Sequence, residues 1–423
     1  MGSVKDLITS GPGAELYVPP SATMFGRGAW AVKGTYSVKD LKHLIPPDEI
    51  PNKAEELTMN TGHFFEWLAK THPEIPTCYL GVLDNNDKIT NVQTLLDRGE
   101  TTNRIVMKLA HVPETFSGGD LDSYRAALQS GELQCGVADV ESIFRKGFPL
   151  GSSTFKRIFR AVRREEQYNT LATYDETASA LDEIRAEVIS RGLGSFPKLE
   201  EILQESGLGT TIPNPGFVLK DMTYDSTTKF ESTGDREITK TEERKLSGLS
   251  DEGHDLWTGE MFPALARAQI KYSNQHNLSN MDGKGECVAY RGMPIVTDFA
   301  NTPDENRLMI VIQRNGAYWA IPSNKEIQRA VFTQAGVDVA IAEAKGNAKD
   351  TGNPDTWKDY FPDALKSHGI NLEEVSDHSR NLMAYAIAEV GNRILGQRVF
   401  DAKPLDDWVG DFMPYASKIE RQE

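Results

Sequence analysis

The sequence predicts an α+β fold. Segments with strand-like and helix-like patterns are mixed along the 423 residues, without the regular β–α–β alternation of a doubly wound sheet. Hydrophobic residues make up 39% of the chain, which is typical of a globular protein with a core. The length allows two to three domains, or one two-lobed protein with insertions. The three cysteines have no C-x-x-C spacing, which argues against a disulfide framework or a structural zinc site.

The charge of the chain limits its partners. With 62 acidic and 46 basic residues the net charge is −16, which works against nucleic-acid binding because that requires a basic stripe. No segment approaches the length of a membrane span, and the N-terminus lacks the apolar run of a signal peptide. We therefore expect a soluble, cytoplasmic protein with no membrane partner; a homo-oligomer stays open. Clustered Arg and Lys can still create a local basic cleft for small anions.

The N-terminal part predicts a tail, a hairpin, a helix and a buried strand. Residues 1–21 are rich in Gly and Pro and are expected to form a tail. Residues 22–38 predict two short strands around a turn, where Gly26, Arg27 and Gly28 could bring backbone amides to a phosphate. Ordinary hairpins share this spacing, so both interpretations stay open. An apolar stripe predicts a helix over 50–70, and 104–112 predicts a buried strand that contains Lys108.

Two later helices have clear patterns. Residues 255–271 predict a helix that Asp255 can cap, with Pro263 early in the helix or bending it. Near the end, Leu382 begins an apolar repeat at every fourth residue, and Gly396 can end that helix. The polar stretches 115–138 and 160–212 are interpreted as insertions.

Residues 281–307 carry the most informative charges. If residues 282–286 are extended, Asp282, Lys284 and Glu286 point to one face. A carboxylate–ammonium–carboxylate row suits a magnesium–phosphate site, because hard oxygens bind the metal and the lysine neutralises phosphate. A three-residue loop at 291–293 would place Glu286 opposite Asp298, whereas a two-residue loop would put them on opposite faces. The alternative is an exposed hairpin with ordinary surface charges.

Two further segments could bind a phosphorylated substrate. Residues 141–156 predict a strand that ends at Arg145 and a loop that contains Ser152, which together fit a phosphate monoester. A helix cap at Ser152 or Ser153 is the alternative. Residues 220–239, which include Lys229 and Asp235, form either a substrate loop or a solvated turn.

Taken in order, five segments resemble the SAICAR synthetases, the phosphoribosylaminoimidazole-succinocarboxamide synthases of purine biosynthesis. They are IPNKAEELTMNTGHFFEWL (50–68), ESIFRKGFPLGSSTFK (141–156), TTKFESTGDREIT (227–239), MDGKGE (281–286) and DFANTPDENR (298–307). The last two are similar to the family's D-x-K-x-E and D-E-x-x-T-P-D-x-S-R patterns. Phe299 stands where an acidic residue is usual, and Asn306 where serine often occurs. Gly283 and Gly285 replace bulkier residues.

The resemblance implies a two-lobed fold, with a smaller lobe over 22–112, a larger α+β lobe over 113–423 and ATP in the cleft between them. It also implies an ATP-dependent ligase that uses Mg²⁺. Such an enzyme joins the carboxylate of carboxyaminoimidazole ribonucleotide (CAIR) to the amine of L-aspartate through an acyl phosphate, giving SAICAR, ADP and phosphate.

The family's functional residues can be carried over onto matching positions. Lys284 and Asp282 would be catalytic, and Glu286 and Asp298 would bind the metal and ATP. The remaining cofactor-binding positions would be Gly26, Arg27, Gly28 and Lys108, and the substrate-binding positions Arg145, Ser152, Arg307, Lys229 and Asp235.

Two rival functions stay open. The inositol polyphosphate kinases have a D-x-K-x-G strand, and Glu286 in place of that glycine favours the ligase. A nucleotide-binding protein without catalytic activity is the other alternative.

Overall fold

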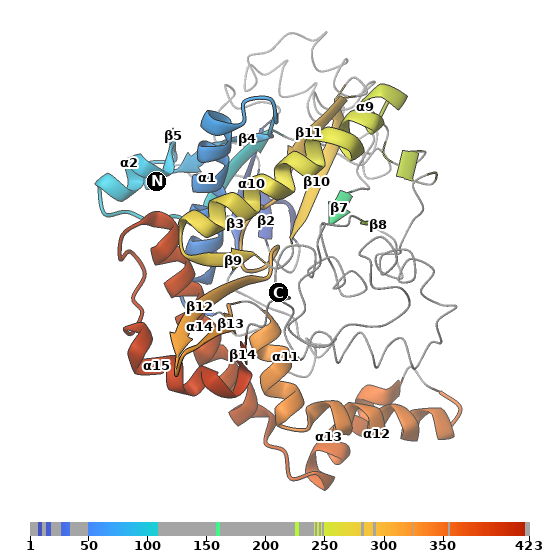
Figure 1. The fold of residues 1–423 in the computed structure, drawn as a ribbon. Helices are drawn as coiled ribbons and strands as arrows, with labels where there is room; N and C mark the ends of the chain where they lie inside the picture. Colours follow the sequence, from blue (N-terminus) through green and yellow to red (C-terminus); the bar gives the residue numbers. More distant parts are fainter. Residues whose placement is uncertain are drawn as a thin grey trace.

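A computed structural model describes most of the second half of the chain and selected parts of the first. The described residues are 7–10, 14–17, 27–33, 50–108, 158–160, 225–227, 241, 243–244, 247, 249–280, 283–290, 293–323, 325–353 and 356–418. The architecture is α+β with antiparallel sheets and flanking helices, which confirms the predicted fold class (Figure 1).

The first sheet is built from the N-terminal quarter of the chain. Its strand order is β1-β2-β3-β6-β4-β5, and every neighbouring pair is antiparallel. The strands are β1 (Leu7–Ser10), β2 (Ala14–Tyr17), β3 (Arg27–Val32), β4 (Tyr79–Leu83), β5 (Ile89–Thr90) and β6 (Arg104–Lys108).

This sheet differs from the prediction in two places. The segment 1–21, expected to be a tail, contributes β1 and β2, because short runs with Leu, Ile and Tyr on either side of a Gly-Pro-Gly sequence can pair as strands. Arg27 and Gly28 lie inside β3 and not in a turn. The strand predicted over 104–112 is present as β6 and is buried at Ile105, Val106 and Met107.

Two four-stranded antiparallel sheets follow. The second sheet has the order β11-β10-β7-β8 and the third the order β14-β13-β12-β9. Their strands are β7 (Ile158–Arg160), β8 (Asp225–Thr227), β9 (Leu278–Asn280), β10 (Lys284–Tyr290), β11 (Met293–Thr297), β12 (Leu308–Arg314), β13 (Ala317–Pro322) and β14 (Ser417–Lys418).

The helices cover these sheets and join them. They are α1 (Lys53–Thr71), α2 (Val92–Asp97), α9 (Asp251–Leu256), α10 (Phe262–Gln275), α11 (Lys325–Gln334), α12 (Val337–Asp350), α13 (Trp357–Ser367), α14 (Leu372–Leu395) and α15 (Leu405–Phe412). A 3₁₀ turn, η8 (Met413–Tyr415), follows α15. Among the described helices, none is both long and apolar enough to cross a membrane.

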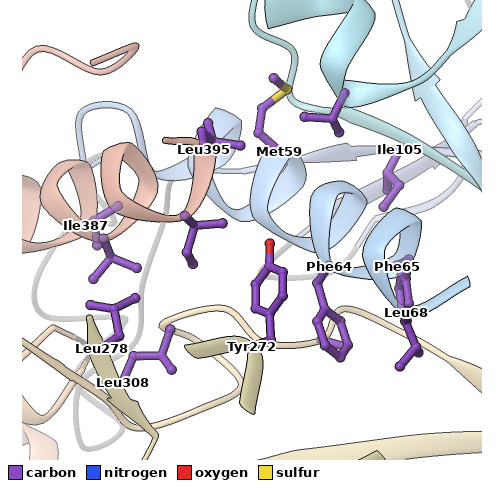
Figure 2. Packing of buried hydrophobic residues seen from close by; sticks show 14 of the residues in the cluster. Met59, Phe64, Phe65, Leu68, Ile105, Tyr272, Leu278, Leu308, Ile387 and Leu395 are labelled. Carbon is purple, nitrogen blue, oxygen red and sulfur yellow. The ribbon is translucent and has the colours of Figure 1, made fainter. Parts of the chain in front are cut away.

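One large core holds the N-terminal and C-terminal parts of the chain together. Figure 2 shows Phe64 of α1 next to Tyr272 of α10, with Leu278 and Leu308 of the third sheet beside Ile387 of α14. All of these side chains are buried. The apolar stripe predicted for the helix over 50–70 and the repeat that begins at Leu382 are therefore confirmed as core faces, and Gly396 ends α14 with φ 67° as expected.

The helix predicted over 255–271 is longer and less regular than expected. It starts in α9, where the side chain of Ser250 accepts a hydrogen bond from the amide of Gly253, so Asp255 is not the cap. A π-helical turn, η6 (Trp257–Met261), leads into α10. Pro263 lies at the start of α10, two residues after this π-helical turn, and the turn is the irregularity that accommodates a proline inside the continuous helix.

A second, smaller core is formed by the helix pair α12 and α13 together with Phe332 of α11. Phe332, Val337, Ala340, Ile341, Ala344, Phe361, Ala364 and Leu365 form this cluster. The pair lies at the lower right of Figure 1, away from β10 and β11.

Candidate active site

The candidate site is built on the hairpin of β10 and β11, which lies beside α10 in Figure 1. Tyr290 pairs with Met293, so the connecting loop has two residues and the expected three-residue loop is wrong. Glu286 consequently pairs with Thr297 and not with Asp298. On an ideal strand this register would turn the carboxylate of Asp298 to the opposite face.

The backbone conformation of Asp298 brings its carboxylate to Lys284, although the strand register alone would turn it away. Asp298 follows the last residue of β11 and has φ 66°, in the left-handed region. This conformation turns the chain out of the strand, and one oxygen of Asp298 lies 3.3 Å from the Nζ atom of Lys284. Apart from glycine, Asn and Asp adopt the left-handed backbone conformation more readily than other residues. The two acids therefore meet at Lys284 through a backbone turn, and not through direct pairing.

Lys284 is the centre of the site. Its ammonium lies 2.9 Å from Glu286, 3.3 Å from Asp298 and 2.5 Å from Glu305. The side chain of Glu286 is 7% exposed, whereas those of Lys284, Glu305 and Asp298 are 18%, 17% and 27% exposed. Three carboxylates around one ammonium leave a formal charge of −2 in a largely desolvated place. We call these four residues the Lys284 cluster.

The back of β10 explains the glycines in the motif. A Cβ atom at Gly285 would lie 2.8 Å from a ring carbon of Phe262 and 2.9 Å from a methyl carbon of Leu265, so only glycine lets α10 approach the strand this closely. A Cβ atom at Gly283 would collide with the amide of Asn306. The side chain of Gln269 donates a hydrogen bond to the carbonyl of Lys284 at 3.1 Å. The two glycines of the motif therefore allow close packing behind the strand.

The segment before β12 brings two distant motifs together. Lys53, at the start of α1, is only 2% exposed and its ammonium lies 2.8 Å from Asp304. The hydroxyl of Thr61 donates to the carbonyl of Ala300 at 3.5 Å. Phe299, which replaces an acidic residue of the motif, packs with Val32, Ala54 and Leu57. The segments 50–68 and 298–307 therefore form one structural unit.

A buried carboxyl lies in the same unit. Glu56 is fully buried, and its pKa is raised well above 4.5 by burial and by the nearby charge of Asp304. It accepts a hydrogen bond from Asn60, and no hydrogen-bond partner is found for its other oxygen. The site assignments made from the sequence left out Lys53, Glu56, Asp304 and Glu305. One signal for Lys53 was present: a lysine in the first helical turn opposes the helix dipole, which indicates a carboxylate partner from elsewhere.

Some of the remaining candidate residues lie in described parts of the chain, and the others do not. Arg27 of β3 and Lys108 of β6 are Cα partners in the first sheet, and Gly28 pairs with Met107. Arg307 is partly buried, directly before β12 and two residues after Glu305. The predictions for Gly26, Asp282, Arg145, Ser152, Lys229 and Asp235, and for the insertions 115–138 and most of 160–212, lie outside the described residues.

The donor set of the Lys284 cluster fits a hard divalent cation that also binds phosphate. Carboxylate oxygens are the protein ligands that Mg²⁺ takes, commonly one or two of them, with substrate phosphates and water completing the shell. Within the described part of the chain, no three acidic, His or Cys side chains are arranged to hold a metal ion alone. Glu286 and Asp298 could bind such an ion together with oxygens of a ligand and water.

Comparisons with known proteins point to one family of structures. No protein-family model matches the chain, and no curated protein matches it. A SAICAR synthase from Saccharomyces cerevisiae in complex with SAICAR is 12% identical, covers 94% of this chain and 97% of its own, and has a TM-score of 0.45.

Two further solved structures are similar at a comparable level. The phosphoribosylaminoimidazole-succinocarboxamide synthase from Ehrlichia chaffeensis is 9% identical, with 77% and 91% coverage and a TM-score of 0.40. The SAICAR synthetase from Pyrococcus horikoshii is 11% identical, with 77% and 88% coverage and a TM-score of 0.39. They belong to the family that the five sequence motifs resemble.

Proposed function

We propose that this protein is an ATP-dependent ligase that joins the carboxylate of CAIR to the amine of L-aspartate. The observation that carries the proposal is the Lys284 cluster: one lysine and carboxylates from two motif segments meet at the end of a hairpin that packs closely on α10. The sequence motifs that resemble SAICAR synthetases supply the substrate class.

The chemistry requires an activated carboxylate. A carboxylate is a poor acyl donor, so a carboxylate oxygen of CAIR attacks the γ-phosphorus of ATP, the bond from that phosphorus to the bridging oxygen breaks, and ADP leaves. The aspartate amine then attacks the acyl carbon, a C–N bond forms, phosphate leaves and the amine proton passes to solvent. Both steps gather anions in one place, and cations that are already positioned lower that cost.

Lys284 supplies positive charge to this site. Its ammonium is held beside Glu286 and Asp298 and stays partly exposed, so it can also reach a ligand. Glu286 and Asp298 are the residues that would hold Mg²⁺, which supplies charge neutralisation on the phosphates when bound. Arg27 and Lys108, neighbours across β3 and β6, are proposed for the nucleotide together with Gly26 and Gly28. Asp282, Arg145, Ser152, Lys229, Asp235 and Arg307 are proposed for CAIR and aspartate.

A turnover assay tests the proposal. The full chain is incubated with ATP, Mg²⁺ and CAIR, with and without L-aspartate, and phosphate and SAICAR are measured. The expected result is phosphate release that requires both CAIR and aspartate and matches SAICAR formation one to one. Phosphorylation of an inositol phosphate instead would establish the kinase alternative, and nucleotide binding without turnover would establish the non-catalytic one.

Two substitutions test the site assignment in the same assay. Lys284→Ala and Glu286→Ala are each expected to lower kcat by about 10²-fold or more. Lys284 supplies positive charge in the transition state, and Glu286 would hold the Mg²⁺ that does the same. Wild-type turnover in both variants would show that the reaction occurs elsewhere.

A further inference from the structure

We propose that Glu305 is a positioning residue for Lys284, and that it is held in place by the ion pair between the buried Lys53 and the partly exposed Asp304. The expected effect on kcat rests on the proposed function. The expected effect on the position of Lys284 rests on the geometry alone.

The contact between Glu305 and Lys284 is the shortest in the cluster. A carboxylate oxygen of Glu305 lies 2.5 Å from the ammonium of Lys284, against 2.9 Å for Glu286 and 3.3 Å for Asp298. A lysine ammonium has three hydrogen-bond donors. Glu286 and Asp298 of the hairpin accept hydrogen bonds from this ammonium, and Glu305 adds an ion pair from the segment before β12. Together they fix the direction of the ammonium until a ligand displaces one of them.

Glu305 restrains the ammonium from a different side than the two hairpin acids do. Glu286 lies two residues from Lys284 on the same strand, and Asp298 is the most exposed member of the cluster. Glu305 approaches from a separate segment, so it restrains the end of a long flexible side chain from outside the hairpin. A group that fixes such a side chain before ligands bind removes a cost that binding or reaction would otherwise carry.

The segment that carries Glu305 is itself held from both sides. Asp304, the preceding residue, is bound by the deeply buried Lys53 at 2.8 Å. Asn306, the next residue, donates to Gln269 at 3.4 Å and packs where Gly283 leaves room. The amides of Glu305 and Asn306 both donate to the carbonyl of Thr302, at 3.1 and 2.8 Å, closing a tight turn. Glu305 is therefore placed by fixed neighbours and is not a residue on a loose loop.

The ion pair between Lys53 and Asp304, which we call the anchor, also explains how a lysine can be buried at position 53. A nearly fully buried lysine requires a compensating charge, because an unpaired buried charge is strongly unfavourable. Its partner Asp304 is the residue next to Glu305. By binding Asp304, the buried Lys53 thus fixes the position of the neighbouring carboxylate of Glu305.

The structural part is tested by chemical labelling of lysines without substrates. The full chain is treated briefly with acetic anhydride, and the acetylation rate of Lys284 is measured by mass spectrometry relative to Lys366, an exposed lysine of α13. Glu305→Ala is expected to raise the relative rate at Lys284 about threefold, the factor that corresponds to losing a partly exposed ion pair. Glu305→Gln, which keeps an acceptor, is expected to lie between wild type and Glu305→Ala.

The matched control is Glu343→Gln. Glu343 is a surface carboxylate of α12 that contacts Ser367 and His368, on the helix pair away from β10 and β11. Its substitution is expected to leave labelling of Lys284 unchanged. Equal labelling of Lys284 in wild type and Glu305→Ala would overturn the positioning role.

Kinetics separate positioning from simple ligand binding. Glu305→Ala is expected to lower kcat about tenfold or more while the KM for ATP changes far less, because a displaced catalytic group loses geometry and not substrate affinity. A raised KM with unchanged kcat would mean that Glu305 serves binding only, and would also overturn the proposal. A wild type that makes no SAICAR, while labelling still responds to Glu305→Ala, would overturn the ligase function and leave the positioning role standing.

The anchor is tested with two variants. Lys53→Met removes the buried charge, and Asp304→Asn removes the partner charge but keeps the shape. Both are checked for a cooperative thermal transition before labelling. A folded Asp304→Asn protein is expected to label faster at Lys284 than wild type, by less than Glu305→Ala. Wild-type labelling in every folded anchor variant would show that Glu305 holds its position without Lys53.

Discussion

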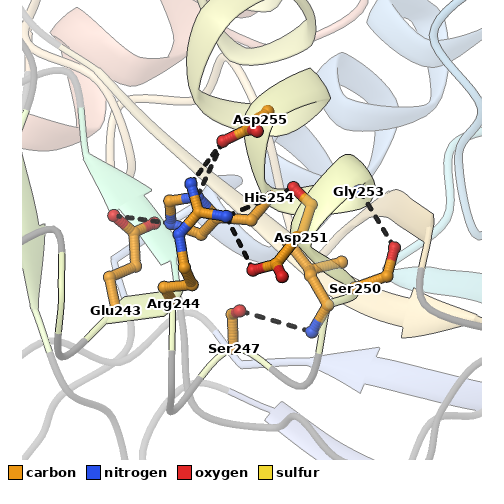
Figure 3. A network of polar contacts seen from close by, with 9 residues as sticks. Glu243, Arg244, Ser247, Ser250, Asp251, Gly253, His254 and Asp255 are labelled. Atoms are coloured by element: carbon orange, nitrogen blue, oxygen red, sulfur yellow. Dashed lines mark hydrogen bonds and ion pairs between the residues drawn. The ribbon is translucent and has the colours of Figure 1, made fainter.

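Two regions of this protein place several carboxylates around one cation, and they do so in opposite surroundings. Figure 3 shows Arg244 between Asp251 and Asp255 of α9, with the buried pair of Glu243 and His254 beside it. Asp251 and Asp255 are 86% and 68% exposed. In the Lys284 cluster the three carboxylates are between 7% and 27% exposed.

The comparison teaches that the same ionic pattern has different consequences at different depth. Around Arg244, water and salt screen the charges, so each pair contributes little. Around Lys284, screening is weak and the carboxylates outnumber the cation, so the cluster is costly unless its charges are balanced. The region around Arg244 is better understood as reinforcement of the α9 N-terminus, together with the cap at Ser250.

The largest expected difference between the two regions is in turnover. Lys284→Met is expected to lower kcat at least about 10²-fold, because it removes the positive charge that Lys284 supplies to the proposed site. Arg244→Gln is expected to keep the rate within about twofold, as a surface substitution away from the site. Steady-state SAICAR formation measures both. Equal losses in the two variants would break the comparison.

Stability is expected to separate the regions by a smaller margin. Lys284→Met leaves the nearly buried carboxylate of Glu286 without its ammonium, and is expected to destabilise the protein by about 2–3 kcal/mol after allowing for partial exposure. Arg244→Gln is expected to cost less than about 1 kcal/mol. Urea unfolding at pH 7 gives both free energies. A larger loss for Arg244→Gln would show that exposure does not set the difference.

The back face of the Lys284 strand provides a third test. Gly285→Val is expected to destabilise by about 1–3 kcal/mol, since its first side-chain atom already meets Phe262 and Leu265 within 3 Å. The matched control is Gly346→Ala in α12, where nothing lies within 4 Å and alanine is expected to stabilise by about 0.5–1 kcal/mol. Thermal unfolding compares the two. A neutral Gly285→Val would mean that α10 can shift away from β10 at little cost.

The smallest expected effect is a pH dependence in the region around Arg244. Burial and then the charge of Arg244 lower the pKa of His254 from 6.5, so the folded state resists its protonation. Below pH 6.5 the unfolded chain takes up this proton more readily, and stability falls as the pH is lowered toward the depressed pKa. Arg244→Gln removes one cause of the depression and is expected to flatten this fall. Urea titrations from pH 7 to pH 5 measure the slope, and an unchanged slope in the variant would contradict this assignment.

The sequence predicts the parts of the site that depend on local periodicity. The two-residue repeat places Lys284 and Glu286 on one face, and the helical repeats place Phe64 and Leu382 in the core. It does not predict the reach of Asp298, because that depends on loop length and on one left-handed residue. It also does not predict the pairing of Lys53 with Asp304, which are about 250 residues apart in the chain. Asp255 was a plausible cap by composition, but Ser250 is the cap and Asp255 is bound by Arg244.

The left-handed residue at the end of β11 makes two separate demands on one position. The backbone demand is met by Gly, Asn or Asp, and the charge demand by Asp or Glu, so aspartate alone meets both. Replacements at 298 would therefore sort into those that keep the hairpin but lose the charge and those that keep the charge but strain the turn. Stability and activity can therefore be measured as separate effects of substitutions at this one residue.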